Sequence, residues 1–125
     1  MARLHHLLVI DDEPIHRESL SELLLADGYE VTTSDCARDA LGRIDSGDHF
    51  DLAICDVMMP GFDGIRFATK LMERPQPIPV VLVTAHTEAV EHILANGLVA
   101  LLKPYSITTL HSVISDHLPR AGLAP

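Results

Sequence analysis

Five short, mostly apolar runs, each followed by a segment with helical periodicity, limit this chain to few folds. The runs cover residues 7–10, 29–34, 52–55, 80–83 and 98–102. Runs of this length predict buried strands, although the second alternates in part and is expected nearer an edge. Strands that alternate with helices predict an α/β fold, a doubly wound parallel sheet with helices on both faces and right-handed crossovers.

The segments between the runs carry helix signals. Pro14 suits the first turn of one helix and Gly28 its end, while Asp63 and Ser106 are candidate N-caps of two others. Helices are therefore expected over residues 14–27, 36–46, 63–74, 87–95 and 106–118. Their predicted inner faces comprise Ile15, Leu20, Leu23, Leu24, Ala37, Ala40, Leu41, Ile44, Ile65, Ala68, Leu71, Met72, Val90, Ile93, Leu94, Ile107, Leu110, Val113, Ile114 and Leu118.

The composition narrows the class of protein. The 125 residues suit one domain, 1–125, with a core of about 7–118 and with 119–125 as a tail or the start of a linker. The net charge of −9 and only nine Lys and Arg residues argue against direct nucleic-acid binding. Neither a bilayer-spanning run nor a secretory signal is evident. Cys36 and Cys55 lack metal-ligand spacing, so a reducing, cytoplasmic setting is expected.

Four of the five predicted strands end in polar groups. The first delivers Asp11 and Asp12, the third Asp56, the fourth Thr84 and the fifth Lys103. Because the carboxyl ends of parallel strands meet at one edge of the sheet, these groups are expected to form one site. The three carboxylates favour binding of a divalent cation such as Mg²⁺. The hydroxyl of Thr84 and the ammonium of Lys103 can each donate a hydrogen bond to a phosphoryl oxygen. The combination predicts a phosphoryl-transfer site.

Four motifs stand out along the chain: LVIDDEP at 8–14, DVMMPGFDG at 56–64, VTA at 83–85 and KPY at 103–105. In this order they resemble the receiver domain of two-component response regulators. The resemblance covers residues 7–118, nearly the whole chain. It implies a single-domain, flavodoxin-like (βα)5 fold with strand order 2-1-3-4-5, like that of the chemotaxis regulators.

The resemblance also implies roles for the phosphoryl-handling residues. Asp56 would accept a phosphoryl group from a histidine kinase or a histidine phosphotransfer protein. Thr84 would move toward that group, and Lys103 would pair with it. Beyond this self-phosphorylation and autodephosphorylation, no enzymatic activity is expected.

A Mg²⁺ site follows from the same resemblance. Asp12 would be a direct ligand, Asp11 would act largely through water, Asp56 would supply a carboxylate oxygen, and Met58 would supply its backbone carbonyl.

The output is expected to be protein binding. The resemblance implies a downstream protein target or a homodimer, through the face formed by the fourth helix, fifth strand and fifth helix. No membrane insertion is expected. Whether the chain is a stand-alone regulator or a part of a larger one stays open.

One position departs from the family pattern. Members often carry Tyr or Phe three residues before the lysine, and this chain has Ala100. The family's usual signal relay, from the threonine to this aromatic ring, therefore cannot operate in this chain. Two alternatives follow: signalling through movement of Thr84 and the fourth helix, or a weak output.

Three alternatives compete with a phosphorylation switch. A phosphatase would need an acid two residues after Asp56, where Met58 stands. A flavin or nucleotide carrier would need a phosphate-binding loop after the first strand, where Asp11 and Asp12 would repel phosphate. A degenerate receiver, used only as a protein-interaction module, is kept open by Ala100 although the Asp, Thr and Lys set is intact.

The histidines show no zinc-site spacing, and a solvated or partly buried role is favoured for each. They include His5, His6, His16, His86, His92, His111 and His117.

Overall fold

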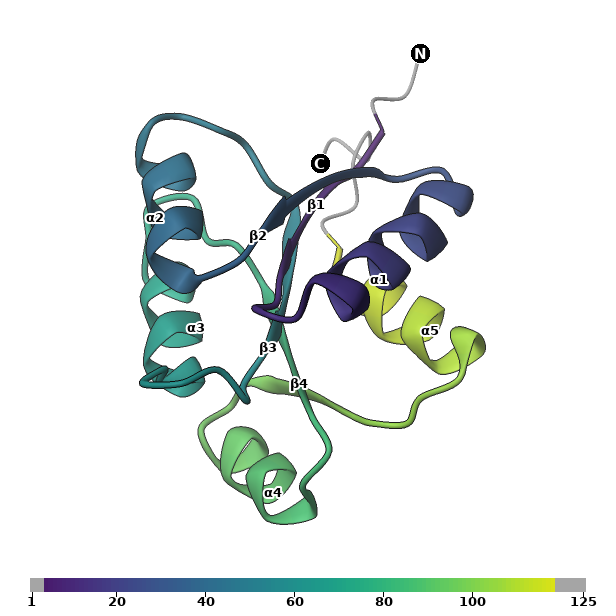
Figure 1. Cartoon of the computed structure of the whole chain (residues 1–125). Coiled ribbons are helices and arrows are strands. Elements are labelled where there is room, and N and C mark those ends of the chain that lie inside the picture. Colours follow the sequence, from purple (N-terminus) through teal and green to yellow (C-terminus); the bar gives the residue numbers. More distant parts are fainter. Residues whose placement is uncertain (1–3, 119–125) are drawn as a thin grey trace.

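A computed structural model describes residues 4–118 of the chain as five strands and five helices in alternation. All strand pairs are parallel, and the order across the sheet is β2-β1-β3-β4-β5, as predicted (Figure 1). The elements are β1 (His6–Ile10), α1 (Pro14–Ala26), β2 (Glu30–Ser34), α2 (Ala37–Asp45), β3 (Leu52–Asp56), α3 (Gly64–Met72), β4 (Val80–Thr84), α4 (Thr87–Ala95), β5 (Val99–Leu102) and α5 (Ile107–His117).

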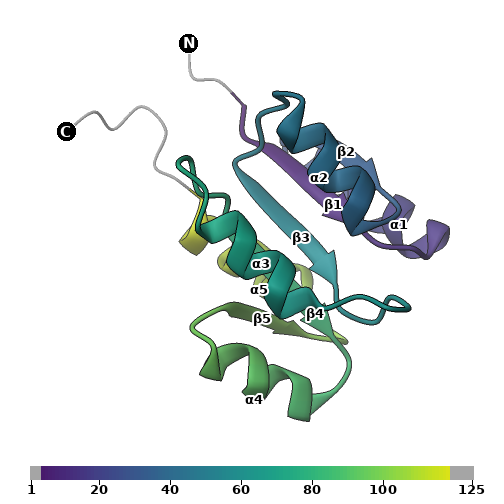
Figure 2. The same cartoon turned by 90° about the vertical axis from the view of Figure 1, so that its left-hand side faces the viewer.

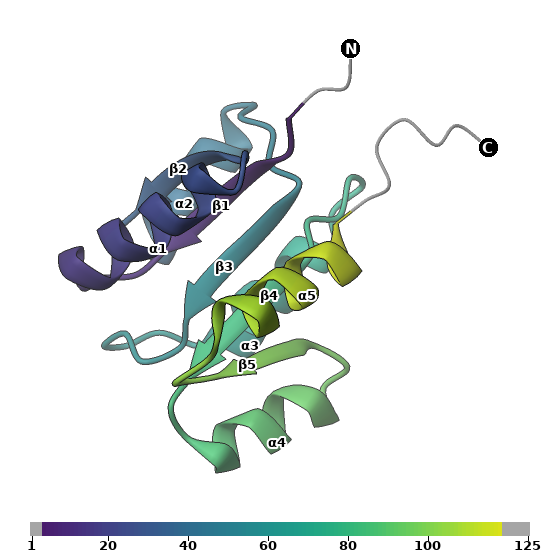
Figure 3. The same cartoon turned by 90° about the vertical axis from the view of Figure 1, so that its right-hand side faces the viewer.

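The sheet separates two apolar cores. Strand residues that alternate along β1, β3 and β4 pack on one face against α2, α3 and α4, and on the other against α1 and α5. Figure 2 shows α2 and α3 in front of the sheet, and Figure 3 shows α1 and α5 covering its opposite face. Each face holds one core, so the sheet is fixed from both sides.

Local sequence explains where the helices begin and end. Pro14 opens α1, and Gly28 just after it has φ +92°, the left-handed conformation that glycine adopts without strain. The Asp63 side chain accepts a hydrogen bond from the backbone of Arg66 as N-cap of α3, and the Ser106 side chain accepts one from Thr109 in α5. The predicted caps are therefore confirmed.

Several predicted boundaries and inward positions are wrong. Helix α3 ends at Met72 rather than near residue 74, and β5 begins at Val99 rather than at residue 98. Five positions predicted to face the core have exposed side chains, because four of the helices bury fewer of their apolar residues than the sequence pattern suggests. These positions are Ile15, Leu23, Met72, Leu94 and Ile107.

In the described part of the chain, no helix combines the length and apolar character needed to cross a membrane. The predicted tail at 119–125 lies outside the described residues.

Candidate phosphoryl-transfer and metal site

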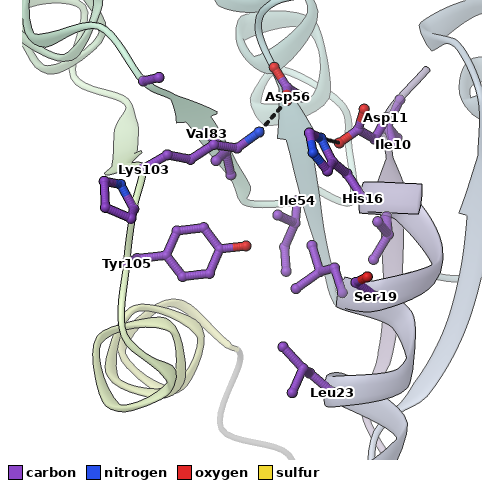
Figure 4. Close-up of a pocket in the computed structure, with 14 residues that line it drawn as sticks. Ile10, Asp11, His16, Ser19, Leu23, Ile54, Asp56, Val83, Lys103 and Tyr105 are labelled. Atoms are coloured by element: carbon purple, nitrogen blue, oxygen red, sulfur yellow. Dashed lines mark hydrogen bonds and ion pairs between the residues drawn. The ribbon is translucent and has the colours of Figure 1, made fainter. Parts of the chain in front are cut away.

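Three strands bring charged side chains from distant parts of the sequence to one edge of the sheet. Asp11 follows β1, Asp56 ends β3 and Lys103 follows β5. Figure 4 shows the three side chains converging at a cavity of about 480 Å³, which is lined by α1, by the ends of β1, β3 and β4, and by residues 103–105. The structure thus brings three of the five predicted groups together around this cavity.

Asp56 is held by two donors that point its carboxylate into the site. Its Oδ1 accepts a hydrogen bond from the backbone N–H of Met58 at 2.7 Å, and its Oδ2 accepts one from Nζ of Lys103 at 2.7 Å. The residue is 8% exposed, so most of its surface is shielded while the carboxylate reaches the cavity. The carboxylate therefore has a fixed orientation.

Asp11 lies beside Asp56 and is equally buried. Burial raises the pKa of the Asp11 carboxyl, and the negative charge of Asp56 raises it further. A hydrogen bond from the backbone N–H of Glu13 and the positive charge of Lys103 lower the pKa, but they do not cancel the rise. Arg17 does not neutralise the carboxylate directly, since its guanidinium donates to the backbone oxygen of Asp11 at 2.7 Å. The two carboxylates thus repel each other within one site.

Lys103 is the cation that compensates this charge. Burial lowers the pKa of its ammonium, but the hydrogen bond to Asp56 and the charges of Asp56 and Asp11 outweigh that effect, so the pKa is raised. Tyr105 lines the cavity next to it, and burial raises the pKa of its phenol despite the opposing charge of Lys103. Lys103 is therefore charged, and Tyr105 is neutral, at ordinary pH.

Thr84 ends β4 with its side chain fully buried. Its Oγ1 accepts a hydrogen bond from the backbone N–H of His86 at 3.1 Å, and its carbonyl accepts one from the backbone of Lys103 at 2.8 Å. A hydroxyl that accepts one hydrogen bond keeps its own proton to donate. Thr84 thus lies at the predicted strand end with a donor still to use.

The remaining predicted metal ligands are less closely gathered. Asp12 is exposed and lines a separate hollow together with Met59 and Phe62. Met58 presents its backbone N–H to Asp56, while its side chain is exposed. The ligand roles of Asp12 and of the Met58 carbonyl stay predictions.

His16 is a site residue that the sequence-based interpretation missed. Among the described residues, one group of three side chains could hold a metal ion, and it consists of Asp11, His16 and Asp56. Their ligand atoms lie within 4.8 Å of one another. The signal was available in principle, since His16 stands in the first turn of the helix that begins just after Asp11.

The donor set fits a divalent cation. Two buried carboxylates repel each other, and the single ammonium of Lys103 balances only one of their two negative charges. Carboxylate oxygens are also the ligands that Mg²⁺ prefers, in sites where it keeps several waters. The residues present can therefore hold Mg²⁺.

Comparisons with known proteins find relatives over most of the chain. A family model described as the response regulator receiver domain matches residues 7–115. The positive alginate biosynthesis regulatory protein of Pseudomonas aeruginosa is 39% identical over 103 residues, which are 79% of this chain and 41% of that protein. The transcriptional regulatory protein FixJ of Bradyrhizobium diazoefficiens is 33% identical over 119 residues, 93% of this chain and 58% of that protein. The chain thus spans about half the length of these relatives.

Solved structures share the fold. The response regulator protein TrrA of Thermotoga maritima, solved in complex with Mg²⁺ and BeF, is 29% identical with a TM-score of 0.81. The match covers 92% of this chain and 100% of that chain.

Proposed function

Because the chain belongs to the response regulator receiver domain family of two-component systems, we propose that it is a phosphorylation switch whose acceptor is Asp56. The observation that carries this proposal is the pairing of a buried, oriented Asp56 carboxylate with Lys103 at the mouth of a cavity. Such a pairing suits a carboxylate that first attacks phosphorus as a nucleophile. The nearby ammonium can then compensate the negative charge of the phosphoryl group that the carboxylate has gained.

The acceptor step is an in-line displacement at phosphorus. A carboxylate oxygen of Asp56 forms the new bond to phosphorus, and the bond from phosphorus to a histidine nitrogen of the donor breaks. The donor is a histidine kinase or a histidine phosphotransfer protein. Catalysis rests on positioning and charge stabilisation, which the fixed orientation of Asp56 supplies.

Mg²⁺ would neutralise charge on the carboxylates and on the incoming phosphoryl group. Asp11 and Asp56 are the buried carboxylates available to hold it. Asp12 is proposed as a direct ligand, with Asp11 acting largely through water and with the backbone carbonyl of Met58 completing the protein ligands. The Thermotoga maritima protein, which was solved in complex with Mg²⁺ and BeF, supports the choice of Mg²⁺ as the cation.

Two residues would hold the phosphoryl oxygens once the new bond has formed. Lys103 already donates to Asp56 and needs only to share its ammonium with an adjacent phosphoryl oxygen. The Thr84 hydroxyl has an unused proton and sits where β4 ends, so a small movement of residues 84–86 would let it donate. That movement pulls on the start of α4, where His86 is the N-cap.

The output surface is proposed to be the α4–β5–α5 face, as a docking site for a downstream protein or as a homodimer interface. Each of its three elements carries one exposed large apolar side chain, Leu94, Leu102 and Ile107 respectively. The position that usually holds an aromatic ring is Ala100, which pairs with Leu82 and packs against the core. The signal would therefore pass from Thr84 to α4 without an aromatic relay.

A test of this function follows the backbone amides by ¹⁵N–¹H NMR while Mg²⁺ and then beryllium fluoride, a phosphoryl mimic, are added. We expect Mg²⁺ alone to shift Asp11 and Asp56, and the mimic to shift Thr84, Lys103 and α4 as well. The Asp56→Asn variant should lose the response to the mimic, whereas Asp45→Asn, at an exposed residue of α2, should keep it. An unresponsive wild type would instead favour a phosphorylation-independent interaction module.

A further inference from the structure

The imidazole of His16 lies against the carboxylate pair. Its Nδ1 is 4.0 Å from Oδ2 of Asp11, and the ligand atoms of Asp11, His16 and Asp56 all lie within 4.8 Å of one another (Figure 4). The residue comes from α1, whereas the two carboxylates come from strand ends. Three separate segments therefore place one nitrogen and two oxygen ligands around the same space.

Local structure explains why His16 points there. Helix α1 begins at Pro14, so residue 16 lies in its first turn, directly beyond the end of β1. Helical side chains lean toward the N-terminus of their helix, and this lean directs the imidazole back over Asp11. The His16 side chain is 60% exposed, so it is free to adjust its position.

The chemistry of the three groups differs from that of an ordinary Mg²⁺ site. Magnesium prefers oxygen ligands, whereas imidazole suits Zn²⁺, Ni²⁺, Cu²⁺ and similar ions. Two ligand atoms that each lie about 2.1 Å from one ion can be at most about 4.2 Å apart. The 4.0 Å between His16 and Asp11 meets that limit, and the separations within the whole group, none above 4.8 Å, exceed it by at most a few tenths of an ångström.

We propose that His16 joins Asp11 and Asp56 as a direct ligand when the site holds a first-row transition ion such as Co²⁺, whereas with Mg²⁺ Asp11 acts largely through water and His16 stays outside the coordination shell. This role deepens the proposed function, because it concerns the same cation site. It makes the metal preference of the chain depend on His16: the imidazole strengthens binding of a transition ion and adds little to binding of Mg²⁺.

Calorimetric titration with Co²⁺ and, separately, with Mg²⁺ tests the assignment on wild type, His16→Gln and His92→Gln. His92 is an exposed residue in the last turn of α4 and serves as the matched control. Loss of even an outer-shell partner of a metal typically costs about 10- to 100-fold in affinity, so His16→Gln should weaken Co²⁺ binding at least tenfold. Its Mg²⁺ affinity should stay within about twofold of wild type, and His92→Gln should match wild type for both ions.

A spectroscopic readout identifies the ligand directly. Bound Co²⁺ is paramagnetic, so the ring protons of His16 should move far outside their usual NMR range, while those of His92 should stay in place. Unshifted His16 ring protons in the Co²⁺-loaded protein, or equal Co²⁺ affinities for wild type and His16→Gln, would overturn the role of His16.

The two proposals fail in different ways. A wild type that neither binds Mg²⁺ nor becomes phosphorylated would contradict the phosphorylation switch. It would not contradict the imidazole ligand, because the Co²⁺ measurements alone test that role. Normal Mg²⁺ binding, together with a Co²⁺ affinity that is the same in wild type and His16→Gln, would contradict the imidazole ligand. The phosphorylation switch would stand.

Discussion

The ammonium nitrogen of Lys103 lies 2.7 Å from Oδ2 of Asp56, although 47 residues separate the two in sequence. They meet because β3 and β5 flank β4 in a parallel sheet, so their carboxyl ends lie at the same edge. This ion pair offsets part of the charge that Asp11 and Asp56 bring into the site. The described site is therefore already organised around an acidic group and its compensating cation.

Removing that cation should destabilise the folded chain. We expect Lys103→Met to lower the free energy of unfolding by about 1–2 kcal/mol at pH 7 without Mg²⁺, between the values typical of exposed and of fully buried ion pairs. Because the pKa of Lys103 is raised above 10.5, its contribution should persist at pH 9 and disappear only as the pH rises through the raised pKa. Urea unfolding at pH 7 and pH 9 measures both effects.

The control for this prediction is a double-mutant cycle with Asp56→Asn. With the carboxylate gone, Lys103→Met should cost clearly less than in the wild type. Equal costs in both backgrounds would mean that the pair contributes nothing to stability.

Neutralising Asp11 should have the opposite effect. Burial and the neighbouring Asp56 raise the pKa of the Asp11 carboxyl, so its charged form destabilises the fold. That penalty is absent below the ordinary pKa of 3.8, develops as the pH rises through the raised pKa, and is complete above it. We expect Asp11→Asn to raise the free energy of unfolding by about 1–2 kcal/mol at pH 7 without metal, the size of a partly buried like-charge contact.

Urea unfolding of Asp11→Asn at pH 7 and near pH 4 measures this effect, and the gain should shrink at the lower pH. The neighbouring Asp12 is exposed, so Asp12→Asn should change stability by less than about 0.5 kcal/mol. A destabilised Asp11→Asn at pH 7 would contradict the described electrostatics.

Two glycines form a matched pair for the packing beside the site. A Cβ added at Gly64, the first residue of α3, would lie 3.1 Å from Val57 and 3.3 Å from Leu82, whereas one added at Gly42, inside α2, would meet nothing within 4 Å. We expect Gly64→Ala to lower the free energy of unfolding by about 1–2 kcal/mol through overpacking. Gly42→Ala should raise it by about 0.5–1 kcal/mol through helix propensity.

Thermal and urea unfolding of both glycine variants provide the measurement. A Gly64→Ala protein as stable as Gly42→Ala would show that the loop before α3 yields freely to the added methyl group.

The strands and the main site could be predicted from sequence because their signals are local. An apolar run such as residues 80–83 is too short for a helix and too apolar for a loop, so it predicts a strand. Once the strands form a parallel sheet, the topology alone places Asp56 and Lys103 at the same edge. The exposure of Leu94 and Ile107 could not be predicted in the same way, because helical periodicity does not reveal how wide a stripe the neighbouring elements cover.

The nearness of His16 to Asp11 was readable in principle from the start of α1, but its nearness to Asp56 was not. Ligand spacing along the chain detects metal sites built from one segment, whereas this group joins α1 to two strand ends. The hydrogen bond from the backbone of Met58 to Asp56 was also hidden, since it depends on how the chain turns after β3. Both features follow from tertiary geometry rather than from pattern.

The measurement that tests the central claim most directly is intact mass after incubation with a small acyl-phosphate donor, with and without Mg²⁺, on wild type and Asp56→Asn. Phosphorylation at Asp56 predicts a gain of one phosphoryl group that needs Mg²⁺ and is lost in Asp56→Asn. A wild type that stays at its starting mass even with Mg²⁺ and a candidate histidine kinase present, or an equal gain in Asp56→Asn, would contradict Asp56 as the acceptor.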